Sequence, residues 1–210
     1  MRKISITEAL NELKLYDSKI TKAITNATLC GAAKKSSDKV GVVKKEDFED
    51  RAKASYQSVT DLIANRNTLK SAVVKSNAIT EVTVADKIMT VAEAIERKNS
   101  IEYDETLLNE MKRQYSNATA TVDKENKKVD VQIDKLLETF TGRDSDKKPD
   151  KDTITAIADP YREKNEFEFI DGIGNMYDKI QKLEAEIDSF KSNVDTALCV
   201  SNSLTMIELE

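Results

Sequence analysis

A seven-residue repeat of apolar side chains in the middle of the chain restricts the possible folds more than any other feature. From Ala94 to Leu136 an apolar residue stands at every seventh position, and a second stripe from Met176 to Ala197 alternates steps of four and three. Side chains at these spacings share one face of a helix and are buried only against another helix. The stripes therefore predict long helices packed side by side. The expected interaction seam of the first helix consists of Ile101, Leu108, Tyr115, Val122, Val129 and Leu136.

The composition favours slender helices over a thick globular core. Only five Gly and two Pro interrupt 210 residues, while 34% of the residues are charged and 5% are aromatic. Many charges with few rings suit helices that have wide solvated faces. We expect a mainly α protein with a small β element, a long antiparallel helical hairpin or coiled-coil bundle capped by a short-stranded sheet. Residues 1–210 are expected to form a single elongated helical domain.

The first predicted helix begins at a capping box. In this motif the Ser5 hydroxyl accepts a hydrogen bond from the backbone of Glu8, and the Glu8 carboxylate reaches back to residue 5. The helix should continue to about Asn26. A second helix is expected from Lys45 to about Lys75.

A second capping box, Thr90 with Glu93, opens the longest predicted helix, from about Val91 to Phe140. At ~1.5 Å per residue this helix would be roughly 75 Å long. We therefore expect it to project as an arm or to bend near the polar residues 124–128. The last long helix is predicted from about Asn175 to Cys199, antiparallel to the helix from Val91 to Phe140.

Short β-branched and alternating segments between the helices predict strands. Residues 28–44 are expected to be a hairpin excursion with strands at 28–32 and 40–43, and the other strands are expected at 79–84, 166–170 and 204–209. Helices and strands alternate along the chain. We expect the strands to form one small mixed sheet at an end of the helical hairpin.

A polar turn is predicted at 141–152, because Gly142 follows the long helix and Pro149 comes soon after. A short helix should follow from about Asp152 to Ala158 and end before Pro160, since proline breaks a helix interior.

The charge balance and hydropathy exclude several classes of protein. The net charge of −5 comes from 38 acidic and 33 basic residues that are mixed along the chain, so no duplex nucleic acid is expected as a partner. No apolar run is long enough for a transmembrane helix or a signal peptide. We expect a soluble protein, cytoplasmic or virion-associated. Cys30 and Cys199 are expected to be buried, unpaired thiols, with a disulfide or a reactive thiol as alternatives.

The sequence predicts no catalytic, cofactor-binding or metal-binding residues. The chain has no histidine, which removes the commonest general base and the commonest zinc ligand. The aspartates from Asp144 to Asp152 resemble a calcium loop, but Pro149 and Thr155 stand where an EF-hand needs Gly and Glu. Gly172 and Gly174 lack the third glycine of a dinucleotide fingerprint and are interpreted as a strand-to-helix turn.

One polar group on the second helix is a candidate site. Arg66 is flanked by Asn65 and Asn67 within an otherwise apolar stretch. These side chains form a possible polar clamp, which would hold backbone carbonyls or a carboxylate, and the alternative is a purely structural role.

The chain also resembles known proteins in several short motifs. ISITEALNELKLYDSKI at 4–20 resembles the first segment of uncharacterised phage and prophage proteins of bacteria. DLIANRN at 61–67, MTVAEAIER at 89–97 and FEFID at 167–171 are similar, in the same order, to the helical septicolysin-like family. The resemblance implies a helical hairpin with a small strand element and carries no catalytic residues.

Four functions are compatible with these observations. We expect a non-enzymatic, phage-encoded structural or assembly protein that forms a homo-oligomer through its helical faces, because such helices bury too little surface within one chain. The alternatives are a phage-encoded effector that binds and inhibits a host protein, a membrane-active toxin, and an enzyme, which the missing histidine disfavours. The phage or host partner is not specified by the sequence.

Overall fold

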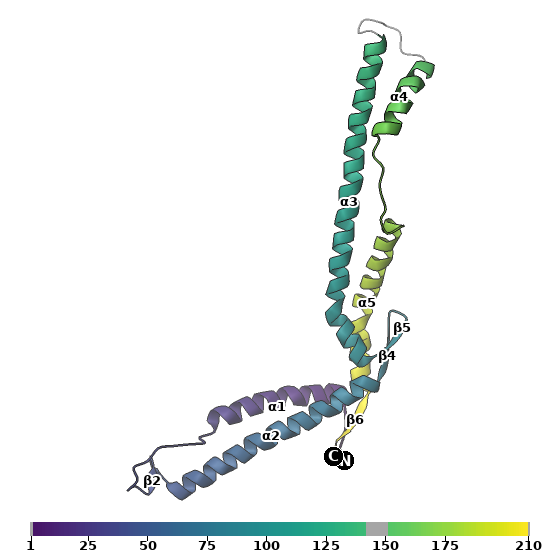
Figure 1. Ribbon diagram of the computed structural model, residues 1–210. Coiled ribbons are helices and arrows are strands. Elements are labelled where there is room, and N and C mark those ends of the chain that lie inside the picture. Colours follow the sequence, from purple (N-terminus) through teal and green to yellow (C-terminus); the bar gives the residue numbers. More distant parts are fainter. Residues whose placement is uncertain (1, 142–150, 210) are drawn as a thin grey trace. The chain divides into compact units, whose positions relative to one another are not determined.

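The protein is mainly α-helical with small antiparallel sheets, as the sequence predicts (Figure 1). The computed structural model describes residues 2–141 and 151–209. These form two compact units: unit 1 comprises Met1–Asn99 and Ser189–Glu210, and unit 2 comprises Ser100–Asp188. The helices are α1 (Ile6–Asn26), α2 (Lys45–Ile79), α3 (Val91–Thr141), α4 (Lys151–Asn165) and α5 (Met176–Leu204). The strands are β1 (Arg2–Ser5), β2 (Lys39–Val40), β3 (Val43–Lys44), β4 (Glu81–Val84), β5 (Lys87–Thr90) and β6 (Met206–Leu209).

The core of unit 1 lies where α1 and α2 pack together beneath the β1–β6 ladder. Ser5 ends β1 and caps α1 through the predicted capping box, which fixes the turn from strand to helix. The ladder contributes one buried side chain from each strand to the core. The buried residues of this cluster are Ile4, Ile6, Ala9, Leu13, Leu69, Val73 and Ile207.

The strands form three separate two-stranded antiparallel sheets, β1–β6, β2–β3 and β4–β5, so the prediction of one mixed sheet was wrong. Each pair is too short to provide a broad apolar face, and each is supported by packing against helices instead. The predicted strands at 79–84 and 204–209 are confirmed as β4 and β6. Their partners β5 and β1 were not predicted from the sequence.

The hairpin predicted over 28–44 is confined to Lys39–Lys44. Residues 28–32 form no strand; they approach the hairpin by packing, and a Cβ on Gly31 would meet Val40 Cγ1 at 2.7 Å and the Phe48 ring at 3.1 Å. The expected strand at 28–32 was therefore wrong: these residues pair with no strand and are all exposed.

In unit 2, α4, the extended segment that follows it and the first part of α5 pack along α3 and run antiparallel to it. Successive contacts pair Asp130 of α3 with Arg162 of α4, Asn126 with Phe167, and Lys112 with Glu184 of α5. Ala158 and Tyr161 of α4 pack on Val129, Ile133 and Leu137. The predicted antiparallel arrangement of the two long helices is thus confirmed.

α3 is helical throughout residues 124–128, where the sequence left a projecting arm or a bend as alternatives. Two local predictions in unit 2 were wrong. α4 continues through Pro160 to Asn165, and residues Ala158 and Tyr161 on both sides of the proline are packed on α3, which offsets the lost backbone hydrogen bond. Residues 166–170 are extended but belong to no strand. The turn predicted at 141–152 falls mostly outside the described residues.

Candidate interaction surfaces

The predicted seam of α3 faces the inside of the chain. Ile101, Leu108 and Val129 are buried, and Tyr115, Val122 and Leu136 are half-buried. The Tyr115 ring meets the Phe169 ring edge-on, with centroids 5.3 Å apart, and lies 5.9 Å from the Tyr177 ring. These contacts within unit 2 occupy the stripe that the sequence predicts for partner binding.

Apolar side chains beside the seam remain exposed and line a groove of about 600 Å³ in unit 2, here called the apolar groove. Leu107 is 53% exposed, Ile170 72% and Ile173 52%. Leu107 stands beside the buried Leu108, and Ile170 stands beside the half-buried Phe169. α3 forms one wall, and α5 with the loop before it forms the other. The lining residues are Leu107, Glu110, Met111, Gln114, Ala118, Phe169, Ile170, Gly172, Ile173, Met176, Lys179 and Leu183.

Charged groups of both signs are held at the rim of the apolar groove. The Glu110 carboxylate accepts from Arg113 Nε at 2.8 Å and from Gln114 Nε2 at 2.7 Å. The hydrogen bonds from Arg113 and Gln114 lower the pKa of Glu110 to about 2. Lys179 donates to the Ile173 carbonyl at 2.6 Å. The rim therefore carries the Glu110 carboxylate, which is paired with Arg113 on α3, and the Lys179 ammonium group on α5.

The loop wall of the apolar groove is fixed by Asp171. Its carboxylate accepts from the backbone of Met176 at 2.7 Å and of Ile173 at 3.1 Å, so it caps the start of α5. These backbone hydrogen bonds, that from Met176 foremost, lower the pKa of Asp171. Gly174 and Asn175 complete the turn with φ of 68° and 52°. The turn joins an extended segment to α5, so the helix side of the predicted strand-to-helix turn is present and the strand is not.

The possible polar clamp is an ion pair between the two helices of unit 1. Arg66 Nε of α2 lies 2.6 Å from Asp17 Oδ1 of α1. Asn65 and Asn67 are exposed beside it, and Asn67 lines a second groove. Arg66 thus binds a carboxylate, one of the two predicted targets, and that carboxylate belongs to the protein's own α1.

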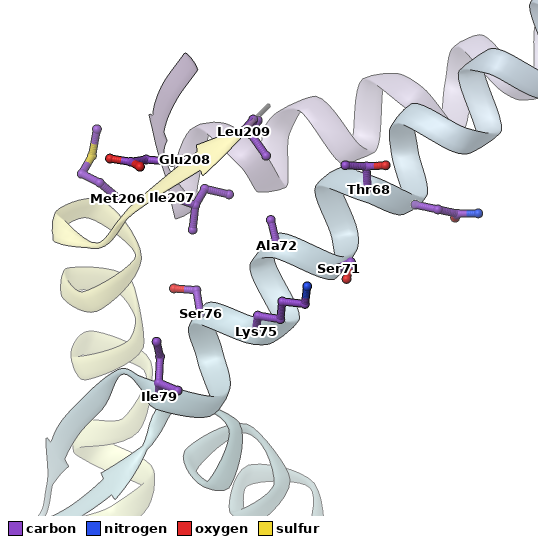
Figure 2. A pocket seen from close by; sticks show the side chains of 11 residues that line it. Thr68, Ser71, Ala72, Lys75, Ser76, Ile79, Met206, Ile207, Glu208 and Leu209 are labelled. Atoms are coloured by element: carbon purple, nitrogen blue, oxygen red, sulfur yellow. The ribbon is translucent and has the colours of Figure 1, made fainter. Parts of the chain in front are cut away.

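The second groove, here called the edge groove, has a volume of about 740 Å³ and lies in unit 1 between α2 and β6. In Figure 2 the Ile207 side chain extends from β6 toward α2, whereas Met206 and Glu208 extend to the other face of the strand. The α2 wall carries mostly small and polar side chains. The lining residues are Asn67, Thr68, Ser71, Ala72, Lys75, Ser76, Ile79, Met206, Ile207, Glu208 and Leu209.

Both cysteines are exposed, so the expectation of buried thiols was wrong. Cys30 lies in the segment between α1 and β2, and Cys199 lies on an outer face of α5.

Among the described residues, no three or more His, Cys, Asp or Glu side chains gather to hold a metal ion. Within residues 2–141 and 151–209, no helix has the length and apolarity that crossing a membrane requires.

Comparison with protein-family models, curated proteins and solved structures finds no match. The class of protein is therefore defined by its fold: antiparallel helix pairs with exposed grooves.

The sequence analysis did not predict either the apolar groove or the edge groove. Leu107 stands next to the seam residue Leu108, and an apolar residue one step outside a buried stripe was the signal available for the apolar groove.

Proposed function

We propose that this protein is a non-enzymatic, self-associating structural or assembly protein, and that a second copy of the chain covers the apolar groove. The observation that carries the proposal is the exposure of Leu107, Ile170 and Ile173 around one groove. Clustered apolar side chains exposed to water mark interaction sites more often than scattered ones do. The lack of histidine in the whole chain argues against an enzyme.

The rim charges favour a second copy as the occupant. A symmetric dimer brings the same surface of two chains together, so each group of one copy meets a different group of the other. Glu110 on one wall and Lys179 on the opposite wall carry opposite charges. A two-fold axis parallel to the length of the groove would bring the α3 wall of each copy onto the α5 wall of its partner, so Glu110 and Lys179 would lie on facing walls and make the surface self-complementary.

The biological setting follows from the sequence motifs. The segment at 4–20 resembles phage and prophage proteins, and we propose that the protein is phage-encoded and acts in the infected cell or in the virion. Under the effector hypothesis, a host target that bound in the apolar groove would compete with self-association for the same apolar side chains.

Sedimentation velocity at tens of micromolar tests the proposal. The wild-type chain should sediment as a dimer or larger oligomer. Leu107→Glu and Ile173→Glu should each give a folded monomer, because a charge in the groove cannot be buried without a partner. Val131→Glu is the matched control, since Val131 is 51% exposed on α3 and does not line the groove.

A wild-type monomer at these concentrations would overturn the self-association proposal. Equal dissociation by Val131→Glu would show that the groove is not the interface. Circular dichroism of each variant separates dissociation from unfolding, because only unfolding lowers the helix signal.

A further inference from the structure

Within residues 2–141 and 151–209, strand β6 is paired along one edge only. It forms a two-stranded sheet with β1, in which Ile4 lies opposite Ile207 and Arg2 opposite Leu209. Just before the ladder, the Ile6 amide donates to the Thr205 carbonyl at 3.0 Å. In an antiparallel ladder the hydrogen-bonded pairs alternate with non-bonded pairs. Ile207 and Leu209 therefore direct their backbone groups toward β1, and Met206 and Glu208 direct theirs to the opposite edge.

The edge groove runs along this second edge. Its walls come from α2 and β6, and none of its lining residues belongs to β1 (Figure 2). Neighbouring strands lie ~4.8 Å apart, and four strand residues extend over ~13 Å. The α2 wall from Asn67 to Ile79 covers ~18 Å at ~1.5 Å per residue. The groove therefore has the length to lay one further strand beside β6 and above α2.

The side chains in the groove specify what kind of strand fits. Ser71, Ala72 and Ser76 are small and permit a close approach of a peptide backbone to α2. Lys75 is exposed in the groove and forms no ion pair with the described residues. The carboxylate of Glu208 is instead paired with Lys3, whose Nζ lies 3.7 Å from Glu208 Oε1. The groove thus offers one uncompensated positive charge, which an acidic side chain would complement.

We infer that the free edge of β6 is a strand-addition site, which binds an extended segment of a partner polypeptide that carries a carboxylate opposite Lys75. Backbone groups of Met206 and Glu208 supply the hydrogen bonds of such a complex, and Lys75 selects the acidic residue. No proline and no bulge protects this edge within Met206–Leu209, although exposed edges are commonly blocked in these ways. The site does not depend on the apolar groove or on self-association.

The test uses the full chain and a fluorescent eight-residue peptide that alternates Thr and Val around one central Glu. Glu208→Pro removes the backbone donor on the free edge and leaves the donors that face β1. Glu208→Ala is its matched control, because it removes the same side chain and retains the donor. Fluorescence anisotropy should show saturable binding to the wild type and to Glu208→Ala. Binding to Glu208→Pro should be weaker by about tenfold or more, the loss expected for one hydrogen bond.

Two further measurements keep the inference testable if Glu208→Pro disturbs the strand. Lys75→Glu should weaken binding of the Glu peptide and favour a peptide with a central Lys. Hydrogen exchange should show the Met206 and Glu208 amides slowed by the peptide, and the Ile207 and Leu209 amides slow with or without it. Equal affinity of Glu208→Pro and Glu208→Ala, with β6 intact, would overturn the inference. Protection of the Met206 and Glu208 amides that grows with protein concentration, without peptide, would also overturn it by assigning the edge to a second copy.

Discussion

The side-chain amide of Asn126 pairs with the backbone of Phe167 through two hydrogen bonds. Phe167 N donates to Asn126 Oδ1 at 2.8 Å, and Asn126 Nδ2 donates to the Phe167 carbonyl at 2.9 Å. One side chain on α3 thus replaces the donor and acceptor that a neighbouring strand would provide. This pairing explains why residues 166–170 are extended without belonging to a sheet.

Asn126→Asp should destabilise unit 2 by about 1 kcal/mol, because the carboxylate keeps one acceptor but faces the Phe167 carbonyl without a donor. Urea unfolding measures the loss, and faster exchange of the Phe167 amide locates it. Asn117→Asp is the matched control, since Asn117 is exposed on the same helix and should change stability little. Equal effects of the two substitutions would refute the role of the pair.

Two adjacent leucines on α3 should respond to different extents in the monomer. Leu108 is 8% exposed, and Leu108→Ala should lower the free energy of unfolding by about 3 kcal/mol through lost burial and a cavity. Leu107 is 53% exposed, and Leu107→Ala should cost the monomer less than about 0.5 kcal/mol. Urea denaturation at a protein concentration low enough to keep the chain monomeric measures both free energies of unfolding. A larger loss at Leu107 in the monomer would mean that the seam is assigned to the wrong face.

Ala85→Gly should stabilise the protein by about 0.5 kcal/mol. Ala85 and Asp86 join β4 to β5 in a two-residue turn and have φ of 50° and 61°, values that cost an alanine energy and a glycine none. Ala120→Gly, on the exposed side of the α3 interior, should instead destabilise by about 1 kcal/mol. Denaturant unfolding measures the free energy of unfolding of both variants. If Ala85→Gly lowers it, the positive φ of Ala85 does not strain the backbone.

The capping box of α1 should make stability depend on pH. The Ser5 backbone donates to the Glu8 carboxylate at 2.8 Å, which lowers the pKa of Glu8 in the folded protein from 4.5. The charged Glu8 carboxylate therefore contributes fully to the free energy of unfolding above pH 4.5. This contribution is lost as the pH falls through the lowered pKa of Glu8 in the folded protein. The stability difference between wild type and Glu8→Gln should shrink in that window. A difference that stays constant through acid pH would contradict this linkage.

Both thiols should react in the native protein, because Cys30 and Cys199 are exposed. Alkylation without reductant, followed by intact-mass measurement, should show two labels per chain under native conditions. A chain two mass units lighter that remains unlabelled would indicate a disulfide. One native label would mean that a partner or a second copy covers the other cysteine.

The helices were predictable because their signals are local. Two capping boxes fix the starts of α1 and α3, and the apolar stripes identify the faces that pack. Pro160 misled the prediction for α4, since packing on α3 maintains the helix on both sides of it. Local sequence cannot report such tertiary support.

The strand pairings and grooves were not predictable for a related reason. β1 contains a single buried side chain, Ile4, and its partner Ile207 is distant in the sequence. The turn between β4 and β5 lacks the Gly and Asn that signal a tight hairpin. The grooves depend on which apolar residues remain uncovered after folding, and that is decided by contacts between distant segments.

The β1–β6 ladder also sets an order of events during synthesis. Residues 2–5 are made before unit 2, but their partners at 206–209 are made only after the whole of unit 2. Unit 2 is continuous in sequence and can fold while unit 1 still lacks its second segment. Domains generally fold as they emerge, and distant pairings form slowly. Until β6 arrives, Ile4 and the α1–α2 core lack their cover, and this exposed intermediate is where a chaperone would bind the nascent chain.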